Sequence, residues 1–202
     1  TPSIQHPVSS IQLRGQPMSS VEWYTGVGDD GFTGVLGRER VPKYALRPEA
    51  YGTVDEASAF LGMARAQSRN EEVRRTLLTV QRDLYTMMAD LATLPETATR
   101  SPWLGEVRLD WLEQQTDAFG AQVEMPKAFI VPGDSPTGAC LEICRTVVRR
   151  AERLVARLSH EGELRDDTSL KYLNRLSSLL FVLGRVEDKA AGIDHFTLAR
   201  GD

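Results

Sequence analysis

The sequence predicts an all-α fold, a five-helix up-and-down bundle that follows a glycine-rich N-terminal loop. Apolar residues recur at three-to-four spacing in five separate segments, as they do in helices that bury one face. Most joins between these segments are short, which favours consecutive helices lying side by side in opposite directions. No segment carries a convincing strand pattern. We expect a flexible arm over residues 1–20 and one helical domain over 21–202.

The chain before the first helix lacks any helical pattern. Residues 1–20 are polar, rich in Ser, Gln and Pro, and aperiodic, which is typical of a mobile segment. Residues 21–47 are punctuated by glycines, which permit backbone conformations that other residues resist. We predict a structured loop there.

The first two helices are delimited by their end residues. The first is predicted from Pro48, which suits an opening turn, to about Ser68. The second is predicted from Asn70, a good N-cap, and ends before Pro95.

The last three helices follow the same logic. The third covers about 104–123, and residues 125–134 then break the pattern with two prolines and a glycine, which predicts a buried connector. The fourth opens with Ser135 as N-cap and runs to about His160. The fifth is capped by Asp167 or Thr168 and continues to about residue 191.

Composition excludes several classes of protein. Apolar residues make up 41%, charged residues 26%, and the formal net charge is −4, which favours a soluble globular protein and gives no bulk attraction for nucleic acid. No apolar run is long enough for a membrane span or a secretory signal, so we expect a cytoplasmic or organelle-matrix location. Cys140 and Cys144 lie four residues apart in a helical pattern, which favours two buried thiols over a disulfide framework or a metal site. The scattered His6, His160 and His195 predict no protein-bound transition metal.

A row of arginines lies on the fourth helix. Arg145, Arg149 and Glu152 fall on one face at spacings of three and four residues, with Arg150 beside them. Guanidinium groups match phosphate and carboxylate oxygens, so the row indicates an anion site or inter-subunit ion pairs. Solvated surface charge is the alternative.

Asp55 lies near the apolar seam of the first helix, where a carboxylate needs a partner. Arg145 is the natural candidate, across a helix or subunit boundary. Alternatively, Asp55 and Glu56 are ordinary surface acids.

The glycine loop carries Thr25, Thr33 and Lys43, which could donate hydrogen bonds to phosphate oxygens. It is neither a Walker A nor a Rossmann motif. An ordinary turn-rich loop is the alternative.

Three uncommon motifs occur in one order: Ala50-Tyr-Gly-Thr-Val-Asp-Glu56, Arg145-Thr-Val-Val-Arg-Arg-Ala-Glu-Arg153 and Tyr172-Leu-Asn-Arg-Leu-Ser177. Together with the glycine loop they resemble the PduO-type ATP:cob(I)alamin adenosyltransferases, collinearly from Tyr24 to about Val186. The resemblance implies a homotrimer of five-helix subunits with ferritin-like packing and active sites between subunits. It also implies transfer of the 5′-deoxyadenosyl group of ATP to the cobalt of cob(I)alamin or a precursor corrinoid, with a reductase and an adenosylcobalamin-dependent enzyme as partners.

The resemblance also assigns residues by position. Catalytic positions are Asp55 and Arg145 as an inter-subunit ion pair, Phe129 as the aromatic that displaces the lower ligand of the corrinoid, and Arg149. ATP contacts are Thr25, Gly28, Thr33, Gly34, Lys43, Arg149, Arg150, Glu152 and Asn174, with the magnesium that accompanies ATP near Glu152.

Four positions depart from the family pattern. Gly26 stands where the family has Lys or Arg, Tyr44 where it has Asp, Asp134 where it has Gly, and Ser178 where it has Asp. These departures leave two alternatives to the enzyme: a sensor or carrier that binds nucleotide or corrinoid without adenosyl transfer, and a helical oligomerisation module without a ligand.

Overall fold

The computed structural model describes residues 24–36, 38–97, 104–124 and 128–200. The chain divides into two compact units, Thr1–Asp30 and Gly31–Asp202. The described part of the first unit contains a tight turn in which the Asp29 amide donates to the Gly26 carbonyl at 3.1 Å. The predicted arm over residues 1–20 lies outside the described residues.

The second unit contains the five predicted helices, with ends that differ from the expected ones by a few residues. Its elements are β1 (Phe32–Val35), β2 (Arg38–Pro42), α1 (Leu46–Gln67), α2 (Glu71–Leu91), a short 3₁₀ turn (Pro95–Thr97), α3 (Glu106–Gly120), α4 (Pro136–His160) and α5 (Thr168–Ala190). The five-helix prediction is therefore confirmed.

Two predicted N-caps make the hydrogen bonds that define a cap. The Asn70 carboxamide accepts from the amides of Glu72 at 3.0 Å and Val73 at 3.3 Å, which satisfies donors that an α-helix leaves unpaired at its start. The Ser135 hydroxyl accepts from the Gly138 amide at 3.0 Å. Local side-chain chemistry thus fixes where α2 and α4 begin.

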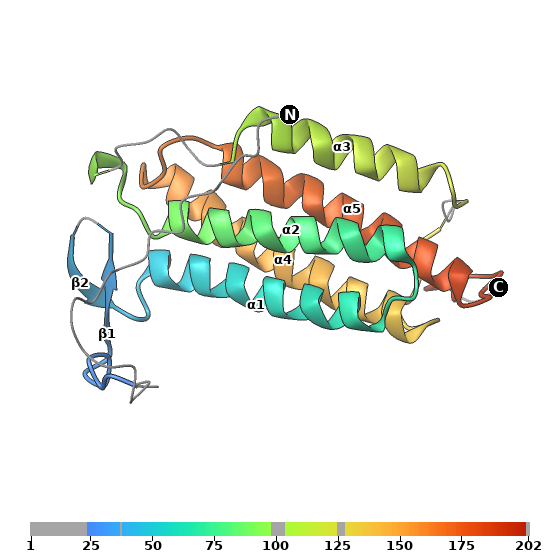
Figure 1. Ribbon diagram of the computed structural model, residues 1–202, viewed down its shortest axis with the longest axis horizontal. Helices are drawn as coiled ribbons and strands as arrows, with labels where there is room; N and C mark the ends of the chain where they lie inside the picture. Colours follow the sequence, from blue (N-terminus) through green and yellow to red (C-terminus); the bar gives the residue numbers. More distant parts are fainter. Residues whose placement is uncertain (1–23, 37, 98–103, 125–127, 201–202) are drawn as a thin grey trace, which may run out of the picture. The chain divides into compact units, whose positions relative to one another are not determined.

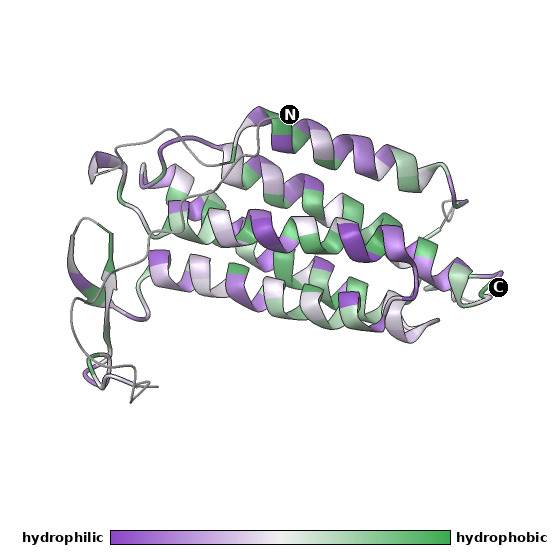
Figure 2. Cartoon of the chain, in the orientation of Figure 1, coloured by the Kyte–Doolittle hydropathy of each residue, from purple (hydrophilic) through white to green (hydrophobic). Residues whose placement is uncertain are grey.

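The helices alternate in direction along the second unit, as an up-and-down bundle requires (Figure 1). α4 packs on α1 and on α5, α2 packs on α1, and α3 packs on α5. Helix α4 therefore lies between α1 and α5, and α5 lies between α4 and α3. Green apolar positions recur along the helices among purple polar ones (Figure 2).

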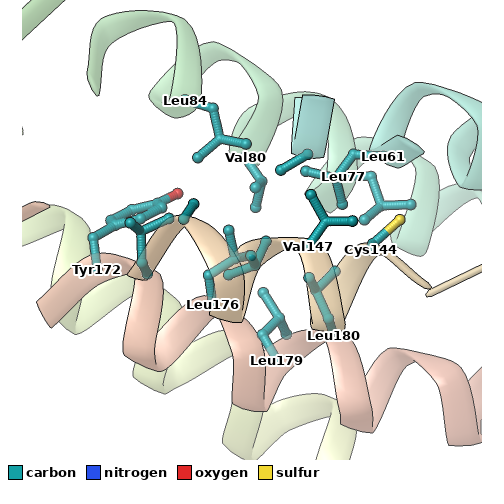
Figure 3. Close-up of a cluster of buried hydrophobic side chains, with 14 of the residues drawn as sticks. Leu61, Leu77, Val80, Leu84, Cys144, Val147, Tyr172, Leu176, Leu179 and Leu180 are labelled. Carbon is teal, nitrogen blue, oxygen red and sulfur yellow. The ribbon is translucent and has the colours of Figure 1, made fainter. Parts of the chain in front are cut away.

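The core is built mainly from Leu, Val and Ala on the facing sides of the helices. Figure 3 shows side chains of α2, α4 and α5 meeting there: Leu77, Val80, Leu84, Cys144, Val147, Tyr172, Leu176 and Leu180. The hydroxyl of buried Tyr172 donates to Asp83 at 2.7 Å, so its one polar atom is satisfied. Cys140 and Cys144 are free buried thiols, as predicted.

Strands β1 and β2 contradict the expectation that the second unit lacks strands. They pair antiparallel, with Thr33 opposite Val41. Leu36 then joins the residues after α2, because its amide donates to the Ala92 carbonyl at 2.8 Å. The sequence of this hairpin contains Gly34, Gly37 and Pro42, which interrupt the alternating apolar pattern that predicts a strand. The strands were therefore missed, because they are held by backbone pairing.

The connector before α4 was predicted to be buried, and this was wrong for its described residues. Phe129 is 90% exposed and Val131 is 45% exposed. The segment instead pairs with the chain after α5: the Val131 amide donates to the Thr197 carbonyl at 2.7 Å, and the Ala199 amide donates to the Phe129 carbonyl at 2.8 Å. These backbone bonds hold an apolar segment at the surface.

Within the described residues, no group of three or more acidic, His or Cys side chains is arranged to hold a metal ion. None of the described helices is both long enough and apolar enough to cross a bilayer.

Candidate functional site

A cavity of about 870 Å³ opens between α4, α5 and the connector segment. Cationic, acidic, aromatic and hydroxyl side chains line it, among them Phe129, Glu142, Arg145, Arg149, Ser178 and Phe181. Its size is within the range of pockets that take small molecules or cofactors. A wall that combines guanidinium groups with aromatic rings suits a large ligand that has both anionic and flat apolar parts.

Helical spacing brings the cavity residues together. Arg145 and Arg149 are four residues apart on α4 and so lie on one face of that helix. Ser178 and Phe181 are three residues apart on α5 and line the same cavity. The predicted grouping of Arg145 with Arg149 is therefore observed, and Phe129 joins them from the connector.

Arg145 pairs with Glu142 inside its own chain. The Arg145 Nε–H donates to Glu142 Oε2 at 2.7 Å, and the Glu142 side chain is 4% exposed. Asp55, by contrast, is exposed on α1. The idea that Asp55 meets Arg145 across a helix boundary is thus wrong, because Glu142 takes that place. The inter-subunit form of the pair stays a prediction.

Glu142 lies in a buried ionic cluster between α4 and α5. Arg185, 2% exposed, approaches Glu142 Oε1 at 3.6 Å and Asp188 Oδ2 at 2.9 Å. The other Asp188 oxygen accepts from the Ser135 hydroxyl at 2.6 Å. A methyl group at Gly138 would lie 2.1 Å from that same oxygen, so the close approach of the helices requires glycine there.

Arg150 forms an ion pair with Glu56 across α4 and α1. Both side chains are nearly half exposed, and ion pairs in water contribute little to stability. Glu56, which the sequence analysis considered only as an ordinary surface acid, is therefore a partner of the arginine row.

Glu152 and Asn174 meet between α4 and α5. The Asn174 side-chain amide donates to Glu152 Oε1 at 2.9 Å. Both residues were assigned to ATP from the resemblance, and the structure brings this pair together. A carboxylate beside a carboxamide suits a magnesium ion that keeps most of its ligands from phosphate and water.

The predicted loop residues fall in both units. Thr33 and Gly34 lie on β1, and exposed Lys43 follows β2, where its amide donates to the Gly31 carbonyl at 2.9 Å. In the first unit, the Thr25 hydroxyl oxygen accepts from the Val27 amide at 3.4 Å, and Gly28 belongs to the adjacent turn.

A polar clasp, which we define as Asp134 and Thr197, ties the connector to the chain after α5. The Thr197 hydroxyl donates to Asp134 Oδ1 at 2.6 Å, and the Thr197 amide donates to Oδ2 at 3.1 Å. The hydroxyl bond is the main reason that the pKa of Asp134 lies below its ordinary value. The clasp lies a few residues from Phe129 at the cavity rim.

Sequence reasoning missed Glu142, Phe181 and Thr197. An acidic residue three positions before Arg145 was a usable signal for Glu142, since residues three apart on a helix are neighbours. Phe181 lies three residues after Ser178 on the same helix, so its position could also have been inferred. Thr197 gave no signal, because its partner is 63 residues away.

The four departures from the family pattern have different surroundings. Gly26 has φ of +70°, which side chains with a Cβ resist, and Tyr44 is 84% exposed. Asp134 belongs to the clasp, and Ser178 lines the cavity.

The chain is similar to known proteins over most of its length. A corrinoid adenosyltransferase of Bacillus subtilis (strain 168) is 40% identical over 174 residues, covering 84% of this chain and 88% of the relative. A corrinoid adenosyltransferase of Citrobacter freundii is 39% identical over 166 residues, covering 82% of this chain and 94% of the relative.

A solved structure has the same fold. It is a variant of a PduO-type ATP:corrinoid adenosyltransferase from Lactobacillus reuteri complexed with cobalamin and ATP. It is 30% identical, with a TM-score of 0.83, and the match covers 89% of this chain and 100% of that chain. The family profile described as cobalamin adenosyltransferase matches residues 23–187. This chain therefore belongs to the cobalamin adenosyltransferase family.

Proposed function

We propose that this protein transfers the 5′-deoxyadenosyl group of ATP to the cobalt of cob(I)alamin or a precursor corrinoid. The products are adenosylcobalamin and triphosphate. The observation that carries the proposal is the cavity of about 870 Å³, in which Arg145 and Arg149 line the same space as Phe129 and Phe181. Guanidinium groups suit an anionic leaving group, and aromatic rings suit the face of a corrin ring.

The reaction is a nucleophilic displacement at carbon. The electron pair of reduced cobalt attacks the 5′ carbon, a cobalt–carbon bond forms, and the bond from that carbon to the triphosphate oxygen breaks. Cobalt is thereby formally oxidised by two electrons, and triphosphate leaves with the bonding pair. Cationic groups fixed near the leaving oxygens stabilise the charge that grows on them. Arg149 is our candidate for this role.

We assign nucleotide binding to residues of α4, α5 and the hairpin, namely Thr33, Gly34, Lys43, Arg149, Arg150, Glu152 and Asn174, together with Thr25 and Gly28 of the first unit. The Glu152–Asn174 pair fits the magnesium ion that accompanies ATP. When bound there, magnesium supplies charge neutralisation of the phosphates, and Glu152 holds the complex in place.

We assign the corrinoid to the side of the cavity that Phe129 borders. Phe129 is 90% exposed, so its ring is available to press on a ligand. Displacing the lower ligand of the corrinoid would make the cobalt easier to reduce, which prepares it for the attack.

The proposal includes a homotrimer with active sites between subunits. It is supported by Asp55, which is exposed on α1 and has no ion pair recorded within the described part of the chain. A neighbouring subunit's Arg145 would supply that partner. We further propose a cytoplasmic or organelle-matrix location with a reductase and an adenosylcobalamin-dependent enzyme as partners, a setting that suits the two free thiols.

The decisive experiment mixes the protein with ATP and chemically reduced cobalamin without oxygen. We expect the absorbance spectrum of adenosylcobalamin and one triphosphate per turnover. Nucleotide binding without any turnover would instead identify a sensor or carrier.

A matched pair of variants tests the arginine assignment. Arg149→Ala should abolish measurable ATP binding in calorimetry, since it removes a cation from the phosphate site. Arg157→Ala, on the same helix but paired with Glu161 at the surface, should bind ATP like the parent. Wild-type affinity of Arg149→Ala would remove that residue from the site.

A further inference from the structure

We propose that Glu142 is the positioning residue for Arg145: its buried carboxylate holds the guanidinium by the Nε edge and leaves the terminal amino groups for a partner or ligand. The inference rests on the proposed function for one point, that Arg145 belongs to the active site. It adds a residue to that site and gives it a role.

The contact between Arg145 and Glu142 involves one edge of the guanidinium and partners of unequal burial, and both features support a positioning role. In the described chain, the one hydrogen bond recorded for the Arg145 guanidinium is from Nε to Glu142 Oε2, at 2.7 Å. Arginine presents a fixed planar fork of donors, so engaging the Nε edge fixes the plane in which the terminal nitrogens lie. Arg145 is 27% exposed, whereas Glu142 is 4% exposed. The acid is thus the fixed partner, and the arginine is the accessible one.

The side of Glu142 that faces away from Arg145 lies against the buried Arg185. Arg185 lies 3.6 Å from Glu142 Oε1 and 2.9 Å from Asp188, which in turn accepts from the N-cap Ser135 at 2.6 Å. The guanidinium of Arg185 also lies over the ring of Phe181, 5.1 Å from its centroid. A cluster anchored at the start of α4 therefore ends at Arg145 on the cavity wall.

Stability alone does not account for this arrangement. A buried carboxylate is costly unless it is fully paired, and Glu142 Oε1 has no hydrogen bond. A buried carboxylate that accepts a hydrogen bond from an arginine on the cavity wall fits a positioning role.

A double-mutant cycle tests the coupling in the full chain. Glu142→Gln keeps the shape but removes the charge, so kcat/KM for the corrinoid should fall about tenfold while KM for ATP stays within about twofold. In an Arg145→Gln background, the same change should alter kcat/KM by less than about twofold, because Glu142 acts through Arg145.

Glu187→Gln is the matched control. Glu187 is also a buried glutamate, 5% exposed, but it lies on α5 and accepts from Ser68 away from the cavity. Its corrinoid kinetics should match those of the parent. An equal loss in Glu142→Gln and Glu187→Gln would show a general effect of removing a buried charge and would overturn the proposal.

A second measurement does not depend on turnover. The Nε–H proton of Arg145, assigned by its absence in Arg145→Gln, should be protected from exchange in nuclear magnetic resonance spectra and should lose that protection in Glu142→Met, which keeps the length of the side chain but removes the acceptor oxygen. Retained protection, or independent effects in the cycle, would overturn the positioning role. A wild-type protein without adenosyl transfer would instead defeat the proposed function, and the exchange measurement would still decide the role of Glu142.

Discussion

Gly26 adopts a backbone conformation that favours glycine over residues with a side chain. The family resemblance places a cation here, and this chain has glycine with φ of +70° in the turn closed by Asp29. A residue with a Cβ in this conformation costs about 1–2 kcal/mol. The turn therefore favours glycine, and a lysine at this position would be strained.

We predict that Gly26→Lys leaves the KM for ATP close to the parental value. Strain would offset the charge-assisted hydrogen bond of about 1.5–3 kcal/mol that a lysine could make to phosphate. Gly26→Ala carries the strain without the charge, so its KM should exceed that of the lysine variant by about tenfold or more. Equal steady-state constants for the two variants would mean that position 26 does not face phosphate.

Glu187 is a buried acid whose charge opposes folding. Burial is the main cause that raises its pKa above the ordinary 4.5; the Ser68 hydroxyl bond opposes this, and the nearby charge of Asp188 adds to it. The folded chain therefore binds this proton more tightly than the unfolded chain does. Stability is lost as pH rises from about 4.5 through the raised pKa, and the loss is complete above it.

Glu187→Gln should consequently melt at a higher temperature than the parent at pH 7. Its amide oxygen can still accept from Ser68, so only the ionisation is removed. The difference should shrink as pH falls toward 4.5 and should vanish below it. Thermal melts of both proteins across this range, monitored by circular dichroism, make the comparison, and a gap independent of pH would contradict it.

The helices were predictable because local chemistry delimits them. Asn70 and Ser135 predict where α2 and α4 begin, and both side chains make the expected N-cap hydrogen bonds. The hairpin was not predictable in this way, since β1 and β2 are paired through backbone groups and contain or adjoin glycines. Periodicity detects helices that bury one face, but it does not detect a short exposed ribbon.

Part of the grouping of the candidate site residues was also predictable from helical spacing. Helical spacing predicts that Arg145, Arg149 and Glu152 share one face of α4. Asn174 was placed with them only by the family resemblance, and the structure pairs it with Glu152. The position of the connector could not be predicted, because an apolar run usually indicates burial. Its exposure depends on backbone bonds to the chain after α5, which no local pattern encodes.

The clasp makes a prediction about this connector. Thr197→Val removes the hydroxyl bond to Asp134 and so loosens the segment that carries Phe129. A net loss of about 1 kcal/mol corresponds to a rise of about fivefold in KM for the corrinoid, with KM for ATP unchanged. Steady-state kinetics with each substrate varied would test this.

Thr86→Val is the control for the clasp, since that partly exposed threonine donates to a carbonyl of its own helix. It should behave like the parent. Identical corrinoid kinetics for all three proteins would mean that the clasp does not govern the connector.

Asp55 and Arg145 bear on how subunits assemble in our proposal. Asp55 is exposed on α1 and Arg145 lies at the cavity on α4, and we propose that the two pair between subunits. We predict a particle of three times 22.4 kDa by light scattering.

Charge reversal tests the contact. Asp55→Arg should place like charges together and shift dissociation of the trimer to higher protein concentration, by about tenfold or more. The double variant Asp55→Arg with Arg145→Asp should recover part of the assembly. Asp110→Arg, an exposed acid on α3, should assemble normally. If Asp55→Arg also assembles normally, Asp55 is a solvated surface acid.

The two native cysteines have a practical consequence. Both are buried, and burial raises the pKa of Cys140 and of Cys144, so neither forms much thiolate near neutral pH. Alkylating dyes should leave the parent protein unlabelled. A single cysteine introduced in place of Phe129 would then be the sole attachment point for a fluorophore, and its emission would report ligand arrival at the rim without background.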